Sequence, residues 1–142
     1  MYFSREVLKN IEDTIGFFKP ECGGIIAMDQ DGVIVDYYFD VNAGTGKASY
    51  IPSRLNLQNY IRDNWSSEKL QFCGVVHSHP FCNTCEPSCI DIDMAIKIMG
   101  INNMEIFYLL MIQGRKMRLY YVRNDDSTQC SCKEEKIEIY RK

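Results

Sequence analysis

Apolar residues recur at two kinds of spacing along this chain, one typical of helices and one typical of strands. In residues 4–18 they are three or four positions apart, which predicts a helix that begins at Ser4 and ends before Pro20. The same spacing predicts a second helix over residues 53–65, with Trp65 in the core. A third helix is predicted over residues 89–100, with Ser88 as its N-cap and Gly100 as its stop.

Short apolar segments between and after these helices predict strands. They occupy residues 22–28, 33–41, 69–79, 105–112 and 117–122, and residues 137–140 predict a charged edge strand. Turn residues at 29–32 and 113–116 predict two hairpins, whereas residues 42–48 predict a loop before a brief edge segment at 49–52. The segment 69–79 is apolar on both faces, as expected of an interior strand. The pattern therefore predicts a single α/β domain over residues 1–142.

Composition narrows the class of protein. The chain has 142 residues, enough for one hydrophobic core, and no apolar run reaches the length of about 18 residues that a membrane helix requires. The net charge of −3 comes without a basic stripe, which argues against nucleic acid as a partner. Residues 1–10 lack the apolar segment of a signal peptide. We therefore expect a soluble cytoplasmic protein without a membrane partner.

The chain has seven cysteines, an odd number that prevents complete internal pairing. Three of them lie close together at Cys82, Cys85 and Cys89. One interpretation is a second, structural metal ion held by these three thiolates, with a fourth ligand supplied from residues 130–132. The alternative is a loop that happens to carry cysteines and can oxidise.

The only two histidines lie at the end of the predicted interior strand, at His77 and His79. Alternate side chains of a strand share a face, so both imidazoles point to the same side while Ser78 points to the other. A catalytic zinc ion takes three protein ligands and keeps a fourth position open. The two histidines therefore predict a metal site that lacks one further ligand.

Asp91 is the candidate for that ligand. In the predicted third helix it shares a face with the inward-facing residues Ala95 and Ile98. A simpler interpretation is that Ser88 and Asp91 only cap this helix, since serine accepts backbone hydrogen bonds there and the helix dipole favours an acid. The histidine pair favours the metal site over a plain cap.

These residues also carry a family resemblance. Glu21, the run His77-Ser78-His79-Pro80, seven further residues, Ser88, two residues and Asp91 resemble the complete signature of the JAMM, or MPN-plus, zinc metalloproteases of the Mov34/MPN/JAB type. The resemblance implies an MPN core, similar to that of cytidine deaminases, with a mixed and mostly antiparallel sheet flanked by helices. It also implies one catalytic Zn²⁺ held by His77, His79 and Asp91. Glu21 would be the general acid and base, and Ser88 would stabilise the tetrahedral intermediate.

The activity implied by this resemblance is hydrolysis of a peptide or isopeptide bond, at the C-terminal tail of a ubiquitin-like or sulfur-carrier protein. One alternative is a non-catalytic module in which the metal is structural and the protein only binds a ubiquitin-like partner. Another is a zinc deaminase, because residues 80–85 resemble its proline-cysteine segment. That chemistry needs a glutamate two positions after the first histidine, where this chain has His79. The oligomeric state is not predicted.

Overall fold

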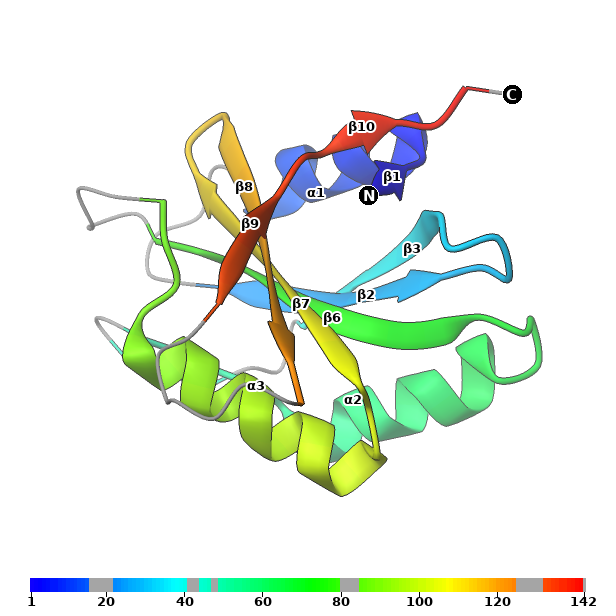
Figure 1. Cartoon of the computed structure of the whole chain (residues 1–142). Helices are drawn as coiled ribbons and strands as arrows, with labels where there is room; N and C mark the ends of the chain where they lie inside the picture. The colour runs from blue at the N-terminus through cyan, green and yellow to red at the C-terminus, as the bar shows by residue number, and fades with distance from the viewer. Residues whose placement is uncertain (16–21, 41–43, 47–48, 80–84, 125–131, 142) are drawn as a thin grey trace.

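A computed structural model describes residues 1–15, 22–40, 44–46, 49–79, 85–124 and 132–141. Its centre is an eight-stranded mixed sheet in the order β10-β1-β3-β2-β6-β7-β8-β9 (Figure 1). The strands are β1 (Tyr2–Phe3), β2 (Gly23–Met28), β3 (Ile34–Phe39), β6 (Gln71–Ser78), β7 (Ile106–Gln113), β8 (Lys116–Arg123), β9 (Lys133–Glu135) and β10 (Glu138–Ile139). A separate hairpin pairs β4 (Gly44–Gly46) with β5 (Ser49–Ile51).

Helices cover both faces of the sheet. Helix α1 (Arg5–Ile15) packs on one face through Val7, Ile11 and Ile15, which are all buried. The other face is covered by α2 (Arg54–Tyr60), which continues into the π-helix η1 (Ile61–Trp65), and by α3 (Cys89–Asn102). Figure 1 shows α2 and α3 on the side of the sheet opposite α1. The protein therefore has two hydrophobic layers, one on each side of the sheet.

The strand β6 lies in the middle of this sheet, as its sequence predicts. It pairs antiparallel with β2 and parallel with β7, and residues 73–79 are all buried. Successive residues face opposite layers, since Val75 packs in the layer of α2 and α3 whereas Val76 packs in the layer of α1. Because side chains alternate along β6, this alternation determines which of the two layers each later side chain faces.

The predicted core position of Trp65 is confirmed. Its side chain is fully buried, and its indole Nε1 donates a hydrogen bond to Asp36 Oδ2 at 2.7 Å. This bond satisfies the polar atom of the largest side chain in the layer, which otherwise would carry a desolvation cost. Trp65 therefore joins η1 to β3 and holds α2 against the sheet.

Four parts of the fold differ from the sequence prediction. Strand β9 pairs with β8 in a segment for which no strand is predicted. The strand β1 was not expected, because two residues carry no periodic pattern and β1 is defined only by its pairing with β3 and β10. The β4–β5 hairpin begins within the predicted loop. The stop at Gly100 is wrong: α3 runs through it to Asn102, and Asn103 ends the helix with a left-handed φ of 54°.

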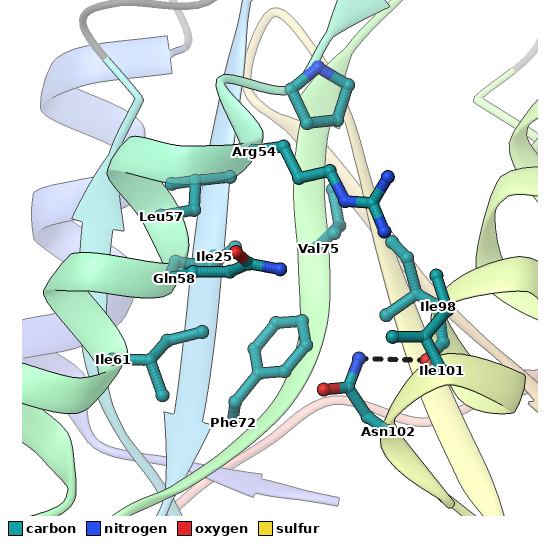
Figure 2. Close-up of a pocket in the computed structure, with 11 residues that line it drawn as sticks. Ile25, Arg54, Leu57, Gln58, Ile61, Phe72, Val75, Ile98, Ile101 and Asn102 are labelled. Carbon is teal, nitrogen blue, oxygen red and sulfur yellow. Dashed lines mark hydrogen bonds between the residues drawn. The ribbon is translucent and has the colours of Figure 1, made fainter.

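A mainly apolar pocket lies between α2 and α3, over residues of β2 and β6 (Figure 2). Separately, none of the helices in the described ranges is both long enough and apolar enough to cross a membrane.

Candidate metal centre

The two histidines lie at the C-terminal end of β6, His77 within the strand and His79 just after it. His77 lies opposite Gly23 of β2 and Met111 of β7, and His79 donates its backbone N–H to Ile112 O at 2.9 Å just beyond the strand. Both imidazole side chains are buried. Because His77 has the same parity as Val75, it faces the layer that contains α3.

The first turn of α3 brings Asp91 to the same place. Ser88 Oγ accepts a hydrogen bond from Asp91 N at 3.2 Å, and Ser88 N donates to Asp91 Oδ2 at 2.8 Å. This reciprocal pair is a capping box, which satisfies two backbone donors at the start of the helix. The cap proposed from sequence is therefore present. It does not compete with the metal site, since it fixes the carboxylate beside the histidines.

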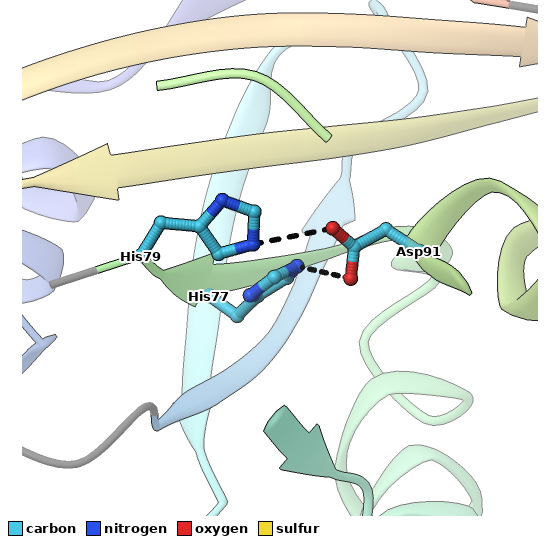
Figure 3. Close-up of side chains that lie close together, drawn as sticks. All are labelled: His77, His79 and Asp91. Atoms are coloured by element: carbon cyan, nitrogen blue, oxygen red, sulfur yellow. Dashed lines mark ion pairs between the residues drawn. The ribbon is translucent and has the colours of Figure 1, made fainter. Parts of the chain in front are cut away.

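The three side chains converge (Figure 3). His77 Nε2 lies 2.9 Å from Asp91 Oδ1, and His79 Nε2 lies 3.2 Å from Asp91 Oδ2. The two imidazole rings are 4.6 Å apart between centroids. One ligand atom from each residue lies within 4.8 Å of the other two, and this group could hold a metal ion. It is the one such group found within the described residues.

The surroundings of Asp91 favour its ionised form. Burial raises the pKa of this carboxyl, but hydrogen bonds with His77 and His79 oppose that effect, aided by the electrostatic influence of His77 and by the backbone N–H of Ser88. The net result is a pKa well below the usual range for aspartate. Asp91 is therefore a carboxylate at neutral pH, which is the form a metal ligand requires.

The architecture around these residues can be compared with known proteins. No family model matches the sequence, and no curated protein matches it. Among solved structures, the chain is similar to AF2198, a JAB1/MPN domain protein from Archaeoglobus fulgidus, with 17% identity, 99% of this chain and 100% of that chain covered, and a TM-score of 0.56. The chain has a JAB1/MPN fold. It is also similar to protein DSY2949 from Desulfitobacterium hafniense, with 16% identity, 99% and 93% coverage, and a TM-score of 0.72.

The donors that the MPN fold assembles here suit zinc. Two imidazole nitrogens and one carboxylate oxygen are a common three-ligand set for catalytic zinc. The imidazole nitrogens lie 2.9 and 3.2 Å from the two oxygens of Asp91, so the three side chains are close enough to share one ion. In addition, His77 Nδ1 lies 3.3 Å from Ser78 O, so Nε2 is the ring nitrogen that faces Asp91 and is placed to bind an ion.

The expected general base, Glu21, lies outside the described residues of this MPN fold. Its neighbour Cys22 is described and is bound to Ser78 on the far side of β6. Ser78 N donates to Cys22 O at 3.0 Å, and Cys22 N donates to Ser78 Oγ at 3.1 Å. No local pattern in the sequence predicts this contact of Ser78, because it depends on the register between β2 and β6.

The second metal site predicted from the cysteines stays a prediction, since the structure describes only two of its three cysteines. Cys85 is fully buried in the core, where its Sγ donates to Met111 O, and burial raises the pKa of its thiol. Cys89 is disulfide-bonded, so its sulfur is not an available thiolate. Cys82 lies outside the described residues. Among the described residues no cysteine belongs to the group of His77, His79 and Asp91, whereas a deaminase site requires cysteines beside the histidine.

Proposed function

We propose that this protein is a zinc-dependent hydrolase that cleaves a peptide or isopeptide bond. The observation that carries the proposal is the convergence of His77, His79 and Asp91 at ligand distances on an MPN fold. The proposed ligands come from two different elements, β6 and α3, and both elements are anchored by hydrogen bonds that are independent of any ion. A site of this kind is organised before the metal arrives.

The chain's own residues have distinct roles in this proposal. His77, His79 and Asp91 would hold a zinc ion, which would supply an activated water molecule and polarise the carbonyl of the substrate. Glu21 would take a proton from the attacking water and deliver it to the leaving amine. The proposal for Glu21 rests on the family signature and on its place next to Cys22, which is tied to the strand that bears the histidines.

Ser88 would have two roles. In the capping box its Oγ is an acceptor, so the hydroxyl proton is not used there. Ser88 is also solvent-exposed. Its hydroxyl can therefore donate a hydrogen bond to the oxyanion of the tetrahedral intermediate while its backbone N–H holds Asp91. Loss of one oxyanion donor lowers turnover by about 100-fold or more in other hydrolases.

For the substrate we propose a bond after the C-terminal tail of a ubiquitin-like or sulfur-carrier protein. This part of the proposal rests on the resemblance to JAMM metalloproteases alone. A suitable assay uses a panel of such carrier proteins, each with a fluorogenic amide attached to the end of its tail, and the zinc-loaded full chain as the enzyme.

A second candidate is a non-catalytic module. The same three ligands join the end of β6 to the start of α3, so an ion there would also stabilise the fold. Glu21→Gln separates the two candidates. A hydrolase loses turnover by about 100-fold or more while its zinc content is unchanged. A binding module shows no turnover in the wild type, and its affinity for the carrier protein does not respond to Glu21→Gln.

A further inference from the structure

Helix α3 is apolar on its outer side as well as on the side that faces the sheet. Ile92, Ala95 and Met99 are buried against the strands. On the outside, Ile90 is 74% exposed and Ile101 is 61% exposed. A helix with apolar residues on all sides is normally covered on all sides. Exposed isoleucines in this number are therefore a sign of a missing neighbour.

These outer residues line a groove between α2 and α3. Its deep part is a cavity of about 90 Å³ whose walls include Ile25, Leu57 and Phe72 (Figure 2). A shallower part of about 450 Å³ follows α3 and includes Ile90 and Met94. The two parts share four residues, Pro52, Arg54, Ile98 and Ile101, so they form one continuous surface. We refer to this surface as the α2–α3 groove.

The rim of the α2–α3 groove is basic, although the chain as a whole has a net charge of −3. Arg54 reaches from α2 toward Ile98 across the opening, as Figure 2 shows, and Lys97 lies on the shallow part. Within the described ranges neither cation forms an ion pair. Asp93 also lines the shallow part, so one negative charge lies beside the two positive ones. A partner therefore meets a rim whose net charge is positive.

We infer that the α2–α3 groove binds an amphipathic helix of a partner protein that carries acidic residues beside its apolar stripe. Ile90, Met94, Ile98 and Ile101 are spaced by four, four and three residues, which is the spacing of a helix-packing seam. The seam spans about 16 Å, or about three turns of a partner helix. Arg54 and Lys97 then pair with carboxylates on either side of the apolar stripe.

Other occupants fit the groove less well. Sites for small organic ligands usually enclose about 300 to 1,000 Å³. Here the deep part between the two helices holds only about 90 Å³, roughly one leucine or phenylalanine side chain, and the part of about 450 Å³ lies mostly along α3, where an extended partner fits better than an enclosed ligand. A second copy of this chain would pair the groove with itself about a two-fold axis. That arrangement places Arg54 and Lys97 of both copies in one interface with only Asp93 of each copy to offset them, which is less favourable than a partner that supplies more carboxylates.

The groove can be tested with the full chain and a designed peptide probe. The probe is a fluorescein-labelled helix of about 18 residues with leucines at the seam spacing and glutamates on both flanks. Its control has lysines in place of the glutamates. Fluorescence polarisation measures binding, and methyl NMR of the isoleucines locates it. We expect the acidic peptide to bind at least about tenfold more tightly than the basic one.

Matched variants test whether binding occurs at the groove. Ile101→Gln should weaken binding of the acidic peptide by about tenfold, whereas Ile96→Gln, on another side of α3, should have little effect. The double reversal Arg54→Glu with Lys97→Glu should weaken it further. The same reversal on α1, Arg5→Glu with Lys9→Glu, is the control for charge, because both residues are exposed on the opposite face of the sheet.

Three results would overturn the inference. One is the absence of binding by the acidic peptide at millimolar concentration in low salt. Another is equal loss of binding in Ile96→Gln and Ile101→Gln. The third is a wild-type dimer in sedimentation equilibrium that Ile101→Gln dissociates, which would identify a second copy as the occupant. None of these measurements depends on zinc or on hydrolysis, so they are independent of the proposed activity.

Discussion

Helices α1 and α3 cover opposite faces of one sheet, but their outer sides differ. On α1 the residues that face away from the sheet are polar, with Arg5, Glu6 and Lys9 exposed. On α3 the corresponding positions include Ile90 and Ile101. Both helices have an apolar inner side, so packing against the strands does not explain the difference. A helix that covers a sheet needs only an apolar inner side, and α1 has no more than that. Helix α3 also carries exposed apolar residues that the fold alone does not require.

These additional residues of α3 lie in two places, the first turn and the outer side of the helix. Its first turn holds Asp91 beside the histidines through the Ser88 capping box, and its outer side forms one wall of the α2–α3 groove. The corresponding cap of α1 is a single hydrogen bond from Val7 N to Ser4 Oγ at 3.2 Å. The comparison indicates that a helix with a purely structural role and a helix with additional roles can be distinguished by their solvent-facing residues.

The largest expected difference concerns truncation of an isoleucine on each helix. Ile11 of α1 is fully buried, so Ile11→Ala should lower the free energy of unfolding by about 3 kcal/mol through lost contacts and a residual cavity. Ile101 of α3 is exposed, so Ile101→Ala should change it by less than about 0.5 kcal/mol. Urea unfolding measures both. A large loss for Ile101→Ala would mean that this residue is part of the core and that the outer side of α3 needs no partner.

The two capping serines give a smaller and more specific contrast. Ser4→Ala and Ser88→Ala should each lower the free energy of unfolding by about 1 kcal/mol, because each removes a cap hydrogen bond. Only Ser88→Ala should also weaken zinc binding, and only modestly, because it loosens the first turn that carries Asp91 while the bond from Ser88 N to Asp91 Oδ2 remains. Competition with a chromogenic chelator measures the zinc affinity of both variants. Equal zinc affinities would show that the cap does not contribute to the site.

The smallest effect tests where α3 ends. An added Cβ at Gly100 meets no atom within 4 Å, so Gly100→Ala should stabilise the protein by about 0.5 to 1 kcal/mol. Gly114, in the turn after β7, has a φ of 62°, so Gly114→Ala should destabilise it. Thermal unfolding of the two variants compares them. A destabilised Gly100→Ala would favour the helix stop that the sequence pattern predicts.

The sequence predicts most of this architecture because most of it is encoded locally. Period-two alternation places His77 and His79 on one face of an interior strand, and the N-cap pattern at Ser88 places Asp91 in the first turn of the next helix. Local patterns do not show that the C-terminal end of β6 lies beside the first turn of α3. The structure shows this arrangement, with the three side chains in contact.

The parts that sequence patterns miss depend on distant residues. Strand β1 exists only through pairing with β3 and with β10, and β10 lies more than 130 residues later in the chain. The environment of Cys85 is set by the carbonyl of Met111 on β7, and no cysteine spacing reveals that contact. Gly100 misleads because glycine ends many helices, whereas here Asn103 adopts the left-handed conformation.

The central claim is that two imidazoles and one carboxylate hold a single zinc ion. It is tested most directly by the zinc content of freshly purified protein, measured by mass spectrometry for the wild type, Asp91→Ala and a matched surface variant of α1, Asp13→Ala. We predict about one zinc per chain in the wild type and in Asp13→Ala, and nearly none in Asp91→Ala. A wild type without zinc after reconstitution, or an Asp91→Ala variant that keeps its zinc, would contradict the claim.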